Sequence, residues 1–461
     1  MTSSVDGLVS GLSTSSLISS LMQVEAAPRD RLKTKVTNAE TVVNAYLAVN
    51  NKLLAAKTAA ADVAKLETWR AVRPTSNSPA VTATATGGLN SATGTMTFDV
   101  TGLARAQVST IKVVTKADLD ADGNLDATAP PIVGPGTLDI TIGDLNKGPG
   151  TTTSITLGTD RSAQGVANSI NSAGIGVKAS VVKVSETESI LQLSGTKTGV
   201  DNAFVITGLG GVGVGGTSPV TATTAADAKI TVGDPLNGGY EVTSASNTFT
   251  GLMPGVSLTA SKVESGVTVT VVSDVSGISG KIQALVDAAN ATLSEVAKQT
   301  AYDPATKKGS ALSGDYSARQ IGSALLGKVS QGLGKLDPAD PEAFGTLRQL
   351  GIQLSKDGTQ LEFKAGDFAT AYTENPDLIK KATTAFAVAI DKAATTQSAG
   401  VTAAVNGRKT LIDSMNDQID NWAVRLTARQ EALQKQYATL ETSLSKLKSQ
   451  STWLSGQLAG L

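Results

Sequence analysis

Residues 408–461 read RKTLIDSMNDQIDNWAVRLTARQEALQKQYATLETSLSKLKSQSTWLSGQLAGL, and this stretch decides the fold. Every seventh position from Ile412 onward is Ile or Leu, and no Gly or Pro interrupts residues 408–455. A sustained seven-residue repeat of aliphatic side chains is typical of a helix that packs along another helix. We therefore predict a long helix with one continuous apolar stripe. The repeat consists of Ile412, Ile419, Leu426, Leu433, Leu440, Leu447, Leu454 and Leu461.

Such a stripe needs a partner helix, and the N-terminal residues supply one. Pro28 is expected to break or kink the first helix. After it, apolar residues recur at three- and four-residue steps from Leu32 to Leu54, which makes this run the natural mate of the C-terminal helix. We call the apolar positions of this pair the leg stripe and predict that they form the oligomer and filament interface. They are Leu17, Leu21, Leu32, Val36, Val43, Ile412, Ile419, Leu426, Leu433, Leu440, Leu447 and Leu454.

The middle of the chain has a different texture. From Arg70 to about Ser276, β-branched residues alternate with small polar ones, and Gly and Pro punctuate the segment. Runs such as Leu138–Ile142 and Val256–Ala260 predict strands, while only Ser162–Ala173 predicts a helix inside this region. A β-rich block is therefore inserted between helices.

The predicted fold class is α+β multidomain, with N- and C-terminal helices paired as coiled-coil legs, a helical trunk domain, and inserted antiparallel β-rich head domains. Residues 393–407 are expected to form a linker or loose helix before the last helix. The predicted boundaries are residues 1–42 and 408–461 for the terminal legs, 43–70 and 277–407 for the trunk, 71–116 and 229–276 for the inner β head domain, and 117–228 for the outer β head domain.

Composition narrows the class of protein. The chain has 461 residues, of which 40% are hydrophobic and 17% charged, and this balance is typical of a globular protein. The net charge of −1 argues against a nucleic-acid partner or an anionic-membrane partner. No apolar run is long enough for a membrane span. The N-terminus lacks a basic region followed by an apolar one, so we expect no Sec-type signal peptide.

The chemistry available to the chain is also limited. It contains no Cys and no His, which removes disulfides, thiol nucleophiles, imidazole bases and the usual zinc ligands. We therefore expect no enzyme activity, no metal site and no cofactor.

Three motifs resemble ligand sites but fail on detail. Gly322–Lys328 approaches a phosphate-binding loop, but Val329 stands where Ser or Thr must hold magnesium, and the segment predicts a helix. The glycine pattern at 208–213 has no helix after it to receive a pyrophosphate. Asp118–Asp126 resembles the start of a calcium loop, but Ala129 replaces the closing carboxylate, so we predict no useful calcium affinity.

Several motifs, in order along nearly the whole chain, resemble the bacterial flagellar filament cap family, also called hook-associated protein 2. Ser13 departs from the family pattern, in which Asp is commoner. The motifs are GLVSGLSTSSLISSLMQVEAAPRDRL at 7–32, SAQGVANSINSAGIGVKASVV at 162–182, ADAKITVG at 226–233, SNTFTGLMPGVSLT at 246–259, LSGDYSARQI at 312–321, LRQLGIQLSKDGTQLEF at 347–363 and SQSTWLSGQL at 449–458.

The resemblance implies a structural cap at the distal tip of the bacterial flagellar filament, outside the cell. Such proteins form a homo-oligomeric ring, of about five or six copies here, that promotes folding and insertion of exported flagellin. The implied partners are further copies of the chain, flagellin, hook–filament junction proteins and a flagellar export chaperone, with a host surface as a further candidate. A secreted coiled-coil adhesin and another flagellar axial protein, such as a hook–filament junction protein, are the alternatives.

Overall fold

The computed structural model describes residues 13–88, 90–114, 132–133, 137–144, 146–185, 188–210, 214, 219–333 and 347–458. The chain divides into two compact units. One, the helical unit, consists of Met1–Lys65 and Val275–Leu461, and the other, the β unit, consists of Leu66–Asp274. The candidate loop at Asp118–Asp126 lies outside the described residues.

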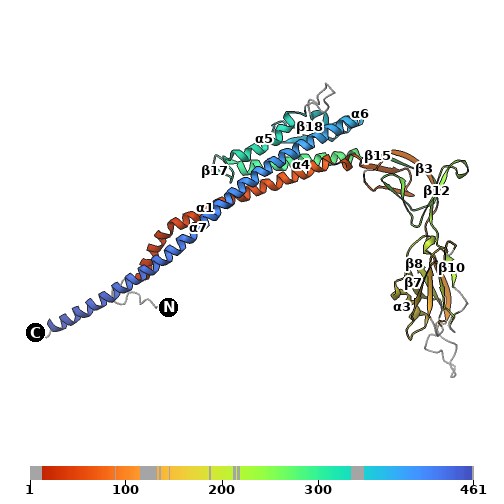
Figure 1. Ribbon diagram of the computed structural model, residues 1–461, viewed down its shortest axis with the longest axis horizontal. Coiled ribbons are helices and arrows are strands. Elements are labelled where there is room, and N and C mark those ends of the chain that lie inside the picture. Colours follow the sequence, from red (N-terminus) through yellow and green to blue (C-terminus); the bar gives the residue numbers. More distant parts are fainter. Residues whose placement is uncertain are drawn as a thin grey trace. The chain divides into compact units, whose positions relative to one another are not determined.

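Two long helices dominate the helical unit. Helices α1 (Thr14–Ala64) and α7 (Pro376–Leu458) lie side by side, as Figure 1 shows in red and blue. They run antiparallel, because Glu25 pairs with Arg429 while Asn50 accepts a hydrogen bond from Ser398. The predicted pairing of the terminal helices is therefore present.

Both helices are longer and less interrupted than the sequence suggests. Pro28 lies inside α1 without ending it. The proline is exposed, so the carbonyl that loses its helical partner can be hydrated instead. Of the two alternatives predicted for residues 393–407, a linker or a loose helix, the structure shows helix, and these residues continue α7 without a break. Burial of Val401 and Val405 offsets the weak helix preference of the surrounding Thr and Gly residues.

Shorter elements complete the helical unit. Helix α4 (Val275–Thr300) packs against α1, and α5 (Tyr316–Ser330) packs against α4 and α7. Gly322–Lys328 is thus helical, as predicted. The remaining elements are the hairpin β16 (Tyr302–Asp303) and β17 (Lys308–Gly309), the 3-10 turn η3 (Leu347–Leu350), the hairpin β18 (Ile352–Leu354) and β19 (Leu361–Phe363), and α6 (Ala365–Glu374).

The β unit contains two separate hydrophobic cores. The first core lies between a five-stranded and a three-stranded antiparallel sheet, in orders β1-β15-β3-β11-β12 and β13-β14-β2. Alternate side chains of each strand point into this core. In β15, for example, Val267, Val269 and Val271 are buried, while the intervening threonines face outward. The strands are β1 (Val72–Ser76), β2 (Val81–Ala85), β3 (Gly94–Gly102), β11 (Ala228–Val232), β12 (Tyr240–Ser244), β13 (Thr248–Met253), β14 (Val256–Ala260) and β15 (Glu264–Ser273).

The second core lies among a four-stranded sheet, β10-β4-β8-β7, a three-stranded sheet, β6-β5-β9, and helix α3. Helix α3 begins with the Ser162 side chain accepting the amide of Gly165 and ends at Gly174 in the left-handed conformation. The elements are β4 (Val108–Val114), β5 (Leu138–Ile142), β6 (Thr151–Ile155), α3 (Ala163–Ala173), β7 (Val177–Lys183), β8 (Glu188–Gly195), β9 (Phe204–Thr207) and β10 (Val220–Thr223).

The structure places one strand differently from the predicted domain boundaries. Strand β4 falls within residues 71–116, which the sequence assigns to the inner head domain. Instead it pairs with β8 and β10, and Ile111 and Val113 belong to the second core. Its alternating pattern predicts a strand but does not say which sheet it joins, because the pairing partners are distant in sequence.

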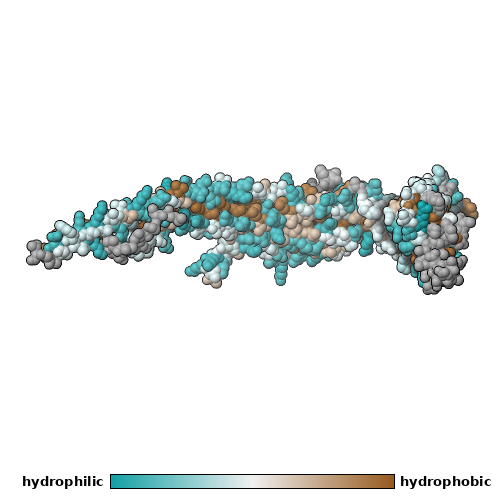
Figure 2. Space-filling model, turned by 90° about the horizontal axis from the view of Figure 1, so that it is seen from below, coloured by the Kyte–Doolittle hydropathy of each residue, from teal (hydrophilic) through white to brown (hydrophobic). Residues whose placement is uncertain are grey.

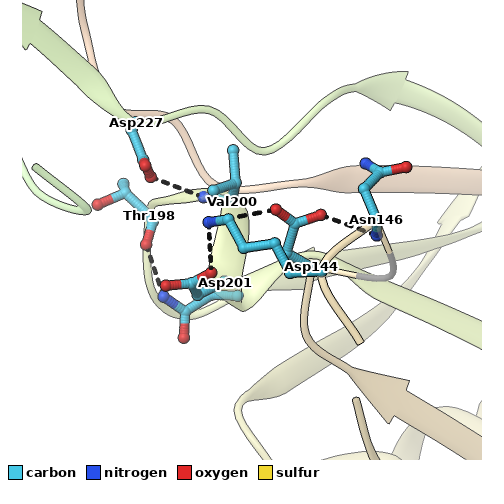
Figure 3. Close-up of polar contacts among 8 residues, drawn as sticks. Asp144, Asn146, Thr198, Val200, Asp201 and Asp227 are labelled. Atoms are coloured by element: carbon cyan, nitrogen blue, oxygen red, sulfur yellow. Dashed lines mark hydrogen bonds and ion pairs between the residues drawn. The ribbon is translucent and has the colours of Figure 1, made fainter. Parts of the chain in front are cut away.

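The two cores are joined by a compact set of polar contacts (Figure 3). The amide of Val200 donates to Asp227, as Figure 3 shows, and the Thr198 hydroxyl donates to the carbonyl of Ala245. On the side of the second core, Lys147 lies 3.3 Å from both Asp144 and Asp201. Gly199, with φ 98° and ψ 150°, lies so close to Ala245 that a Cβ atom on it would sit 2.7 Å from the Ala245 Cβ. This joint therefore requires glycine at 199.

Candidate functional site: the paired terminal helices

The structure brings part of the leg stripe together at the seam between α1 and α7. Val36 and Val43 of α1 are buried, as are Leu426 and Leu433 of α7. Leu32, Ile412 and Ile419 are half-buried. Side chains seven residues apart return to one face of each helix, and here that face is the one covered by the partner helix. The middle of the leg stripe is thus an intramolecular seam.

The two ends of the leg stripe remain exposed in the single chain. Leu440, Leu447 and Leu454 expose 47%, 60% and 55% of their surface. Leu17 and Leu21 expose 46% and 39%. These five positions have no covering element within the described chain and remain candidates for intermolecular contact.

The antiparallel register accounts for where burial stops on α7. The Glu25–Arg429 pair, at 3.0 Å, fixes which levels of the two helices face each other. Extended to Thr14, the first described residue of α1, the same register reaches α7 at about residue 440. Residues of α7 beyond that level therefore have no facing residue in the described part of α1.

A polar cluster marks the level where α5 meets the helix pair. The Tyr46 hydroxyl donates to the Asp315 carboxylate, Arg408 lies 3.4 Å from the same carboxylate, and its guanidinium lies 4.8 Å above the Tyr46 ring. Asp315 also accepts the amide of Ala318 and so caps the N-terminus of α5. One carboxylate therefore connects α1, α5 and α7.

The cluster shifts the pKa values of its members. Burial, followed by the hydrogen bond to Asp315, raises the pKa of Tyr46 to about 12. Burial alone would raise the pKa of Asp315, but the hydrogen bonds from Tyr46 and from backbone amides, with the Arg408 charge, hold it below its usual value. The sequence pattern does not reveal this cluster, because Asp315 is far in sequence from both of its helical partners.

The described residues contain no helix long and apolar enough to cross a membrane. The described part of the chain also lacks any group of three or more His, Cys, Asp or Glu side chains arranged to hold a metal ion.

Comparison with known proteins identifies the family. The flagellar hook-associated protein 2 N-terminus model matches residues 10–107, and the C-terminus model of the same protein matches residues 225–449. The chain belongs to the flagellar hook-associated protein 2 family. Both ends of the helical seam lie within or beside the matched regions, so the pairing of terminal helices is built from family-matched sequence.

Individual members of the flagellar hook-associated protein 2 family match over much of their length. The Salmonella typhimurium protein of that name is 27% identical over 335 residues, which cover 66% of this chain and 68% of that protein. The lateral flagellar hook-associated protein 2 of Vibrio parahaemolyticus is 27% identical over 355 residues, which cover 73% of this chain and 68% of that protein.

A solved structure confirms the fold. The D1–D2–D3 domains of the flagellar cap protein from Escherichia coli superpose with a TM-score of 0.56 at 22% identity. The match covers 79% of this chain and 99% of that structure. The α+β multidomain architecture predicted from the sequence is therefore shared with a solved family structure.

Proposed function

We propose that this chain is the structural cap at the distal tip of the bacterial flagellar filament. The observation that carries the proposal is the match to hook-associated protein 2 at both ends of the chain. The E. coli protein of the same fold is described as a flagellar cap protein. The role is structural, and it places the protein outside the cell at the filament tip.

In this proposal, about five or six copies form a ring that promotes folding and insertion of exported flagellin. The exposed ends of the leg stripe support such a role. Leu440, Leu447 and Leu454 continue an apolar stripe past the level of the described partner helix. Nearer the middle of the helical unit, Figure 2 shows a further band of hydrophobic residues at the surface. Closed symmetry hides repeated apolar surfaces without producing open-ended fibres. Flagellin, hook–filament junction proteins and an export chaperone are the further partners of this proposal.

The test is location combined with flagellin retention. A strain lacking this protein is complemented with an epitope-tagged chain, and filaments are labelled with gold for electron microscopy. Labelling at the distal tip alone, with flagellin retained on the cell rather than lost to the medium, is the expected result. Labelling at the filament base would instead indicate a hook–filament junction protein, and labelling along the cell surface would indicate an adhesin.

A further inference from the structure

The outward faces of α1 and α7 carry opposite charges at the level where the two helices lie beyond the end of α4. In an α-helix, successive residues turn by about 100°, so residues four and seven apart share a face. On α7, Asp413, Asp417 and Asp420 follow these steps and lie on the face opposite the seam residues Leu426 and Leu433. All three aspartates are exposed. This acidic face consists of Asp413, Asp417 and Asp420.

The outward face of α1 carries the complementary charge. Arg31 and Lys35 are four residues apart, exposed, and turned about 100–140° around the helix from the buried seam residue Val36. This basic face consists of Arg31 and Lys35. Within the described chain neither these two cations nor the three aspartates form an ion pair. The charges are consequently free to bind another molecule.

The spacing on the two helices matches in reverse order. On α1, Val24 precedes Arg31 by seven residues, and Lys35 follows by four. On α7, Asp413 precedes Asp417 by four residues and Val424 follows by seven. An antiparallel contact can therefore oppose Arg31 to Asp417 and Lys35 to Asp413 at once. The same alignment opposes the two valines, which expose 74% and 70% of their surface.

The acidic face and the basic face lie at similar positions along the helix axis, so two copies placed side by side can bring them together. Within one chain, Glu25 faces Arg429 and Asn50 faces Ser398. A contact that opposes Arg31 of one copy to Asp417 of the next shifts α7 along α1, relative to the register within one chain, by less than about two helical turns, or roughly 9 Å at most. Because α1 and α7 are antiparallel within each chain, two parallel neighbours present α7 antiparallel to α1. Adjacent copies therefore need little displacement along the helix axis.

We propose that the acidic face on α7 of one copy binds the basic face on α1 of the next copy. This inference rests on the proposed ring and names the surface that joins its members in the legs. The occupant is a second copy of this chain, because the charge, the spacing and the apolar residue at the end of each face are all complementary to the chain itself. The contact is heterologous, so each copy uses both faces, and the proposed ring forms when the rotation between neighbours closes on itself.

Charge reversal in pairs tests the proposal. One full-length variant carries Arg31→Glu with Lys35→Glu, and the other carries Asp413→Lys with Asp417→Lys. Sedimentation velocity across a range of protein concentrations measures assembly. Each variant alone is expected to need at least about tenfold more protein than the unmodified chain to reach the same mean mass, because attraction becomes repulsion at every contact.

Mixing supplies the decisive measurement. The first variant has two acidic faces and the second has two basic faces, so alternating contacts in an equimolar mixture are expected to raise the mean mass above that of either variant alone, in open complexes as well as in even-membered rings. Raising the salt from about 0.1 M to about 1 M shortens the Debye length from about 10 Å to about 3 Å and is expected to weaken the restored complex. The matched control is Lys307→Glu with Lys308→Glu, which makes the same charge change as the first variant at exposed positions of the β16–β17 hairpin.

The outcomes separate this inference from the proposed function. If the unmodified chain assembles but both reversed variants assemble equally well, or if their mixture restores nothing, the inference is wrong while the cap proposal stands. A strict monomer at all concentrations contradicts the ring and this contact together. If the variants assemble normally but no longer bind flagellin filaments in co-sedimentation, the faces bind flagellin and the inference is again wrong. Circular dichroism melts of every variant establish that each is folded.

Discussion

Tyr46 shows how one side chain ties the helical seam to the trunk. Its hydroxyl donates to Asp315, which in turn holds Arg408 and the first turn of α5. Tyr46→Phe removes the hydrogen bond to a charged acceptor without leaving a cavity, and we expect the free energy of unfolding to fall by about 1.5–3 kcal/mol. Denaturant titration of the full chain measures it. Tyr316→Phe, at a residue that is 73% exposed, is the control and should change little.

The same cluster predicts a pH dependence. The pKa of Tyr46 is raised to about 12 in the folded chain, so the folded state favours the neutral phenol. Its contribution to stability is complete below pH 10 and is lost as the pH rises from about 10 toward about 12. The lowered pKa of Asp315 gives a contribution that is present at neutral pH and lost in acid. Melting temperatures from pH 9 to pH 12 should fall less steeply in Tyr46→Phe, and identical slopes would contradict this account.

Gly199 is the second residue whose identity the structure requires. Its backbone conformation belongs to a region that only glycine occupies readily, and a Cβ would meet Ala245. We expect Gly199→Ala to destabilise the joint between the two β cores and to speed hydrogen exchange at the amides of Val200 and Phe204. Gly174→Ala is the matched control, since Gly174 also has positive φ but nothing within 4 Å of its Cβ position. Equal effects from the two substitutions would show that the contact with Ala245 is unimportant.

Along helix α7, the leg stripe has a buried part and an exposed part, and one pair of substitutions can distinguish their roles. Leu433 and Leu440 are successive rungs of the same repeat, but Leu433 exposes 6% of its surface and Leu440 47%. Leu433→Ala should lower the free energy of unfolding of the purified chain by about 2–4 kcal/mol, through lost contact and a cavity. Leu440→Ala should leave the melt nearly unchanged and reduce motility and flagellin retention instead.

Lys446→Ala is the control for the exposed rungs. It removes one exposed charge next to Leu447 and should change neither the melt nor swimming. If Leu440→Ala swims like the unmodified strain, or if Lys446→Ala is the more damaging substitution, the end of the leg stripe is not the contacting face.

At the scale of the whole molecule, the β unit has the properties of an inserted domain. Its two ends meet, because β1 pairs with β15 and the amide of Asp274 donates to the carbonyl of Ala71. We expect the fragment 66–274 to fold by itself, as inserted domains with adjacent ends commonly do. Cooperative thermal unfolding and protected amides in the isolated fragment are the readouts. A fragment without amide protection would show that the helical unit is required for the β unit to fold.

The hydrophobic period of each region could be predicted from the sequence, because it depends only on which side chains lie near one another along the chain. The seven-residue repeat from Ile412 identified the long C-terminal helix, and the strands predicted at Leu138–Ile142 and Val256–Ala260 have those bounds in the structure. The helix predicted at Ser162–Ala173 is likewise present, as α3. Motifs spread along the chain also indicated the family.

Tertiary structure alone decided which residues meet. Strands such as Val72–Ser76 and Val220–Thr223 have few buried side chains, so their local pattern is weak and their pairing partners define them. Continuity of α7 through 393–407 depends on packing against α1, and a helix preference summed along the sequence does not contain that contact. The repeat predicts that Leu433 and Leu440 share a face, whereas the extent of α1 decides that one is buried and the other exposed. Contacts between residues far apart in the sequence carry no local signal, and for that reason the Tyr46–Asp315–Arg408 cluster became visible only in the folded chain.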